Sequence, residues 1–305
     1  MALLRKKANS SKRRFIVEVV KGRCGPKRSR QRVMFNLHPE SGNGSAEERF
    51  EQRLLAADWE NALGPLRFND SLRPEELAEA VFFQNALVLL KALLEENGTR
   101  ATPAGSLNRK FFERVYQEMQ VNGLTRQVLE VLSVLDERSV WPVQEVRLGS
   151  EVAGLIQRRD GRVEVTEAAR GWMESGSEGA LYRQLFIGYF RRFNWDRRRF
   201  LRRVPELQAS AAVSLWRLGK LVGNGATVES LLGTMLRPET LKALERAEKE
   251  KDFHGFTLIR NFLDVLVNFG LLRLDNPGEL RAGMDHFIVR TTPLWNRFIR
   301  FAPGS

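Results

Sequence analysis

The sequence predicts a mainly α-helical protein that carries small β-hairpins. Apolar residues recur at three- and four-residue intervals along much of the chain, as on the buried face of an amphipathic helix. Three short extended segments interrupt these helices, and each ends on a threonine (Thr102, Thr166 or Thr292) from which a new helix is expected to begin. A helix, a glycine, a hairpin and a capped helix in this order are typical of a winged helix. We therefore expect tandem winged-helix-like units.

Residues 1–44 predict a basic N-terminal arm. Residues 1–45 contain 12 Lys/Arg and only two acidic residues, so the net charge of this segment is +10. Residues 1–13 are poor in apolar side chains, which predicts disorder. Arg14–Lys21 has the β-branched content of a strand, and together with Val33–Phe35 it is compatible with a small β-hairpin that has a basic loop.

Residues 45–122 predict a helical domain that ends in a degenerate winged-helix-like unit. Ser45 and Glu48 have the spacing of a capping box, so a helix is expected to begin there. Pro74 marks the start of a second helix, which we expect to reach about Glu96. Thr102-Pro103 resembles the first turn of a third helix.

Residues 123–204 predict a winged-helix-like unit with a basic wing. A helix is expected before Ile156, and Asp160-Gly161 is a strong indication of a hairpin turn. Thr166 is expected to cap the next helix, and an aromatic stripe then runs into a cluster of arginines. In residues 205–305 the same order predicts a C-terminal winged-helix-like unit, whose first cap is Thr227.

The predicted wing, Arg158–Arg162, contains three arginines within five residues. In a DNA-bound winged helix such a tip lies along the sugar–phosphate backbone, where cations displace condensed counterions. The alternative is that these are ordinary polar residues of an exposed hairpin tip.

The helix before the wing would be the recognition helix. Its candidate outward residues are Gln144, Glu145, Arg147, Ser150 and Glu151, and two carboxylates make it a weak base-contacting surface.

The cluster from Arg191 to Arg203 contains seven arginines and a single acid, Asp196. Arginines of this kind grip phosphates, and Trp195 is a candidate for stacking on an unpaired base. The alternative is that the aromatic residues lie in the core and the arginines form a solvated face.

The predicted nucleic-acid contacts of the whole chain are the basic residues of the arm, the wing and the arginine cluster. They are Arg5, Lys6, Lys7, Lys12, Arg13, Arg14, Lys27, Arg28, Arg30, Arg32, Arg158, Arg159, Arg162, Arg191, Arg192, Arg197, Arg198, Arg199, Arg202 and Arg203.

No catalytic motif, metal site or cofactor site is expected from the sequence. The three histidines are far apart, the single cysteine is Cys24, and the chain lacks C-x-x-C, H-E-x-x-H, G-x-S-x-G and P-loop motifs. A non-enzymatic protein is therefore the prediction. No signal peptide or long apolar run is visible, so we expect a cytoplasmic protein without a membrane partner.

Residues 101–107, 161–166 and 193–195 carry a family resemblance. The motif of threonine, two residues, glycine, one residue and leucine, followed by a threonine-capped unit, resembles uncharacterised bacterial proteins, some of them plasmid-borne. The resemblance covers roughly residues 75–300 and implies tandem winged helices and a bacterial origin, but no activity. The chain departs from it at Ala169, where a glycine often follows the threonine.

The sequence is compatible with two functions. The first is a nucleic-acid-binding protein in regulation or mobile-element biology, which binds mainly through phosphate contacts, with double-stranded DNA favoured over RNA. The second is a protein-interaction adaptor, or a subunit of a larger complex, whose winged helices dock a partner. A strong salt dependence of duplex binding is expected only for the first.

Overall fold

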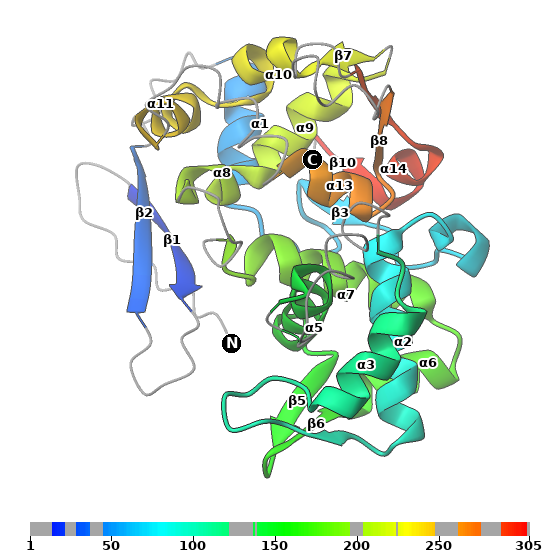
Figure 1. Ribbon diagram of the computed structural model, residues 1–305. Coiled ribbons are helices and arrows are strands. Elements are labelled where there is room, and N and C mark those ends of the chain that lie inside the picture. Colours follow the sequence, from blue (N-terminus) through cyan, green and yellow to red (C-terminus); the bar gives the residue numbers. More distant parts are fainter. Residues whose placement is uncertain are drawn as a thin grey trace. The chain divides into compact units, whose positions relative to one another are not determined.

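The computed structural model describes residues 45–121, 137, 139–195, 204–223, 225–247, 262–275 and 288–303, and the backbone of two strands at 14–21 and 29–36. The chain divides into two compact units (Figure 1). Unit 1 consists of residues 1–68, 194–265 and 272–305, and unit 2 of residues 69–193 and 266–271. Helices dominate, and the sheets are small and antiparallel. The prediction of a mainly α protein with small hairpins is confirmed.

Unit 2 places a three-stranded sheet among helices. Its elements are η1 (Pro74–Leu77), α2 (Val81–Glu95), β4 (Thr99–Arg100), α3 (Arg109–Glu118), α5 (Trp141–Val152), β5 (Ile156–Arg159), β6 (Arg162–Val165), α6 (Glu167–Glu174) and α7 (Glu178–Arg191). The strand order is β4-β6-β5. Thr99 pairs with Val163, and Ile156 pairs with Val165, so both neighbours of β6 are antiparallel to it.

This sheet corrects the predicted domain boundaries. The sequence placed residues 45–122 and 123–204 in separate domains, yet β4 and β6 are strands of one sheet. The degenerate winged-helix-like unit that was predicted at the end of residues 45–122 therefore supplies the first α-helix, α2, and the first strand, β4, of unit 2. Residues 45–68 belong instead to unit 1, where β3 (Leu66–Phe68) pairs with β10 (Ile299–Phe301). Strand pairing between distant segments decides both boundaries, and such pairing is not visible in local sequence patterns.

Two predicted helix starts in unit 2 are also wrong. The helix expected from Pro74 is split, because η1 ends at Leu77 and α2 begins only at Val81. Thr102 does not cap a helix. Its side chain instead accepts a hydrogen bond from the Ser106 amide at 3.0 Å and closes a turn. The cap of α3 is Asn108, whose side chain accepts a hydrogen bond from the Phe111 amide at 3.0 Å.

The core of unit 2 is aromatic, and a distant segment completes it. Phe269, which is fully buried, lies with its ring centroid 4.9 Å from Phe82 and 5.3 Å from Phe186. The Tyr182 hydroxyl donates a hydrogen bond of 2.7 Å to the Phe269 carbonyl. Gly270 follows in the left-handed region (φ 71°), where a β-carbon would come within 3.1 Å of the Ala80 backbone. Residues 266–271 are thus part of this core.

Unit 1 repeats the order of unit 2 around a second three-stranded sheet, β7-β9-β8. Its elements are β1 (Arg14–Lys21), β2 (Ser29–Asn36), α1 (Ala46–Leu55), β3, α8 (Pro205–Ala209), α9 (Ala211–Leu221), β7 (Ala226–Thr227), α10 (Val228–Met235), α11 (Pro238–Ala247), α13 (Asp264–Asn268, whose last residues enter unit 2), β8 (Leu272–Asp275), β9 (Ile288–Thr291), α14 (Pro293–Phe298) and β10. The predicted caps at Ser45 and Thr227 are confirmed, as is Thr166 in unit 2.

Helix α1 is fixed to α9 by aromatic and ionic contacts. Phe50 meets Trp216 edge-on at a centroid distance of 5.1 Å. Beside them, Glu51 pairs with Arg217 at 2.6 Å, and the Lys220 ammonium group lies 3.7 Å above the Trp216 ring. The N-terminal arm contains a hairpin, as the sequence suggested, in which all eight residues of β1 pair with β2.

Candidate nucleic-acid interface

The predicted wing is a tight hairpin formed by β5 and β6. Asp160 and Gly161 form the turn with positive φ angles of 50° and 73°, as a two-residue hairpin turn of the I′ type requires. Arg159 pairs with Arg162 across the turn. The predicted hairpin at Asp160-Gly161 is therefore confirmed, and it places the three arginines of the wing at or next to its tip.

Successive residues of a strand point to opposite faces of the sheet, and this separates the wing arginines. Ile156, Val163 and Val165 are buried and define the inner face. Arg158 pairs with Val163 and therefore shares that inner face. Arg159 and Arg162 lie on the outer face. Two of the three predicted wing contacts thus lie on the outer face of the sheet, and one lies on the inner face.

Arg158 is held inside unit 2. Its Nη2 lies 3.2 Å from Glu151 Oε2, and its guanidinium group lies against Gly105, where a β-carbon would collide with it. Only 26% of its side chain is exposed. Its position corrects the prediction that Arg158 contacts phosphates, because the guanidinium group joins the wing to the 102–106 turn and to α5.

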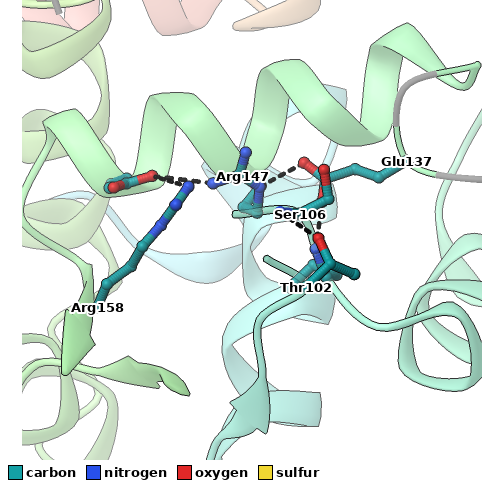
Figure 2. A network of polar contacts seen from close by, with 7 residues as sticks. Thr102, Ser106, Glu137, Arg147 and Arg158 are labelled. Carbon is teal, nitrogen blue, oxygen red and sulfur yellow. Dashed lines mark hydrogen bonds and ion pairs between the residues drawn. The ribbon is translucent and has the colours of Figure 1, made fainter. Parts of the chain in front are cut away.

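A buried polar network continues from Arg158 (Figure 2). Glu151 also accepts a hydrogen bond from Arg147 at 2.9 Å, and Arg147 donates through Nε to Glu137. Glu137 Oε2 in turn accepts the amide of Leu107 at 2.6 Å. The side chains of Arg147 and Glu137 are 4% and 0% exposed. Because both charges are buried and paired, the network stabilises the loop before α3 and offers no open site.

Arg162 has a supporting role at the end of a helix. Its Nη2 donates hydrogen bonds of 2.9 Å to the carbonyls of Asn97 and Gly98, just after α2. A cation at this position interacts favourably with the carbonyl end of the helix dipole. Arg162 is half-buried, whereas 75% of the Arg159 side chain is exposed, with Asp160 as a weak partner at 3.8 Å.

Helix α5, the predicted recognition helix, does not present a base-contacting surface. Each of its residues is buried or half-buried. A β-carbon at Gly149 would meet Phe82 of α2 at 3.0 Å, and one at Gly188 of α7 would come within 2.6 Å of Ala153, the residue that ends α5. Close packing against α2 and α7 therefore covers this helix (Figure 1).

The predicted outward residues of α5 are corrected accordingly. Glu145, Arg147 and Ser150 are buried, with 7%, 3% and 0% of their surface exposed, and Gln144 and Glu151 are half-buried. Glu145 accepts a hydrogen bond from the Tyr189 hydroxyl of α7. Polar side chains in a helix predict a face turned to solvent, but internal hydrogen bonds and ion pairs allow these residues to be buried.

Trp195 is placed in the interior of unit 1. It is 7% exposed, and its ring meets Phe262 edge-on at 6.2 Å, so the prediction that it stacks on a base is corrected. Arg191 is half-buried and Arg192 is exposed. Arg197, Arg198, Arg199, Arg202 and Arg203 lie outside the described residues, as do Arg5, Lys6, Lys7, Lys12, Arg13, Lys27 and Arg28. Arg14, Arg30 and Arg32 lie in β1 and β2, which the structure describes as backbone only.

One basic residue of the sheet was missed from the sequence. Arg100 of β4 is exposed and pairs with Arg162. A two-residue strand has no periodicity of its own, so the segment was not recognised as part of the wing sheet. The indication was the glycine before it: Gly98 and Gly225, with φ angles of 84° and 88°, each precede the first strand of a three-stranded sheet.

A family model matches part of the chain. Residues 78–178 match the family model of the Y4jL N-terminal domain, and this segment lies within unit 2, from the residues before α2 to the start of α7. The match supports a relationship of this segment to that domain family. No curated protein matches the chain, and no solved structure matches it either.

In the described part of the chain, no group of three or more His, Cys, Asp and Glu side chains is arranged to hold a metal ion. None of the described helices is both long and apolar enough to cross a bilayer.

Proposed function

We propose that this protein is a non-enzymatic nucleic-acid-binding protein whose ligand is double-stranded DNA, and that each unit contains a winged helix. The observation that carries the proposal is the shared element order. In unit 2 it is helix α2, strand β4, helices α3 and α5, then the β5–β6 hairpin, and the sheet order is β4-β6-β5. Unit 1 has the equivalent sheet order, β7-β9-β8.

The distribution of charge supports a polyanionic ligand. Residues 1–45 contain 12 Lys/Arg against two acidic residues, and within this segment β1 and β2 form a β-ribbon. A two-stranded ribbon fits the major groove of B-DNA, and dense positive charge promotes association with phosphates. The burial of α5 favours contacts to the DNA backbone over base contacts from that helix.

The proposal is tested by gel retardation of a labelled duplex with the full-length folded chain at low ionic strength. Binding is expected with similar affinity for two duplexes of unrelated sequence, because phosphate contacts carry little sequence information. Deleting residues 1–32 is expected to weaken binding to both duplexes equally. Absence of any retardation by the folded full-length protein would overturn the proposal.

The burial of α5 also favours a second candidate function, a protein-interaction adaptor. A winged helix whose recognition helix is covered keeps its fold while losing the surface that enters a groove. The adaptor would then dock a partner protein through other surfaces of its winged helices. If this were the function, duplex binding would be absent at low salt, although the chain elutes as a stable folded protein.

A further inference from the structure

Three arginines form one row across the sheet of unit 2. Arg100 of β4 is paired with Arg162 of β6, and Arg162 is paired with Arg159 of β5. Directly paired residues of antiparallel strands point to the same face, so the row lies on the outer face of the sheet. Paired Cα atoms are about 5 Å apart, and the row therefore spans about 10 Å.

The outer two arginines of this row are open to solvent. Arg100 is exposed, and its side chain makes no hydrogen bond or ion pair with another described residue. The side chain of Arg159 is 75% exposed. The central Arg162 is anchored through Nη2 to the two carbonyls after α2. The row thus consists of a fixed central cation and two cations at its sides that reach solvent.

Like charges that face each other across strands are unfavourable unless a counter-charge lies between them. The equivalent sheet of unit 1 provides one. There, Arg273 pairs with Arg290 across β8 and β9, and Asp275 contacts both guanidinium groups at 3.5 and 2.7 Å.

The row of unit 2 has no such carboxylate between its arginines among the described residues. Asp160 lies at the turn, 3.8 Å from Arg159, and its side chain is 91% exposed. Glu164 occupies the next outer-face position of β6, where it accepts a hydrogen bond from Gln157 at 2.9 Å. The row therefore keeps a net positive charge, unlike the Arg273–Arg290 pair of unit 1, which Asp275 neutralises in part.

We propose that the Arg100–Arg162–Arg159 row is a binding site for the backbone phosphates of a DNA duplex. This inference rests on the proposed function and deepens it by assigning the contact surface. Arginine offers a rigid fork of donors that matches phosphate oxygens. Each DNA strand carries one phosphate per 3.4 Å of helix axis, so a row of about 10 Å faces about three phosphates.

The test is the salt dependence of duplex affinity for the full-length Arg100→Gln/Arg159→Gln variant. Arg162 is kept, because it supports the end of α2. Each lost phosphate contact lowers the magnitude of the log–log salt slope by about 0.9, so the double change is expected to lower it by about 1.8. Duplexes of unrelated sequence should lose affinity by the same factor.

The matched control is Arg73→Gln/Arg170→Gln, which removes the same charge from exposed positions outside the sheet. It is expected to keep the wild-type slope. The Arg100→Lys/Arg159→Lys variant retains the charge and is also expected to keep the slope. Circular dichroism and thermal unfolding check that all variants are folded.

The outcomes separate this inference from the proposed function. If the wild-type chain binds and the Gln variant keeps the wild-type slope, the row is not a phosphate site, and duplex binding rests on the arm. If the control lowers the slope as much as the row variant, the effect is one of net charge and the assignment is overturned. If the wild-type chain binds no duplex at low salt, the proposed function itself fails.

Discussion

Arg158 and Arg159 are neighbours in sequence with opposite surroundings, because strand alternation sends them to different faces of β5. Arg158 lies against Gly105 and pairs with Glu151, whereas Arg159 reaches solvent. A run of basic residues in a hairpin is therefore not one surface. The strand register decides which of its charges a ligand can reach.

This difference predicts separate effects of two matched substitutions. Arg158→Gln removes an internal ion pair and should lower the free energy of unfolding by about 1 kcal/mol, without changing the salt slope of duplex binding. Arg159→Gln should lower the slope by about 0.9 and leave stability within about 0.5 kcal/mol of wild type. Urea denaturation and fluorescence anisotropy measure the two quantities. Identical effects of the two changes would contradict the assigned faces.

Because Glu137 and Arg147 form a buried ion pair, substitutions of the two residues should have strongly coupled effects on the free energy of unfolding. Arg147→Met leaves the buried Glu137 carboxylate without its counter-charge and should cost about 3–5 kcal/mol. Glu137→Gln should cost less, because Arg147 keeps Glu151 as a partner at 2.9 Å. The double variant should cost clearly less than the sum of the single changes. Chemical denaturation of the four proteins of this cycle gives the coupling energy. Simple additivity would show that the two residues do not form a pair in solution.

Tyr182 predicts a dependence of stability on alkaline pH. Burial raises the pKa of the Tyr182 phenol well above its ordinary value of 10.0. The unfolded chain therefore releases this proton at a lower pH than the folded chain does, and stability falls as pH rises above about 10. Tyr182→Phe should make this fall less steep, at a cost of about 1–2 kcal/mol at neutral pH, because the Phe269 carbonyl loses its donor. Unfolding measured from neutral to alkaline pH tests both effects, and an equally steep alkaline fall in the variant would contradict the first.

At the level of elements, the sequence predicted helix caps and turns more accurately than it predicted the pairing of distant strands. Ser45, Thr166 and Thr227 cap helices as expected, because a cap depends on residues within one turn. The two-residue strand β4 and the pairing of β3 with β10 were missed, because neither has a pattern of its own.

The candidate interface was predicted only in part, for the same reason. The turn at Asp160-Gly161 is local and was predicted correctly. The burial of Arg158 and of α5 depends on packing against α2, α7 and the 102–106 turn, which the sequence does not reveal. Arg100 is recognised as a residue of the candidate interface only because β4 pairs it with Arg162 of β6.

Residues 266–271 are the element on which the core of unit 2 most depends. Phe269 contacts rings from both α2 and α7, so Phe269→Ala should open a cavity and cost about 3–5 kcal/mol. Leu63→Ala is the control, because Leu63 is 79% exposed and its loss should change stability by less than about 0.5 kcal/mol. Urea denaturation measures both. A small effect of Phe269→Ala would mean that the segment does not complete this core.

At the scale of the whole molecule, charge is distributed unevenly. The formal net charge of the chain is +12, and residues 1–45 contribute +10 of it. The remaining residues are therefore close to neutral. A basic site among them depends on where its cations lie and not on a large net charge. The row on the sheet of unit 2 is such an arrangement, and the arm is expected to supply the larger, sequence-independent attraction to a duplex.

Duplex binding through backbone phosphates is tested by the affinity of the full-length chain for one duplex as a function of salt concentration. A straight line is expected in the log–log plot, with affinity falling by more than about tenfold between about 50 and 200 mM salt. Affinity that is independent of salt, or no binding at the lowest salt concentration, would contradict the claim.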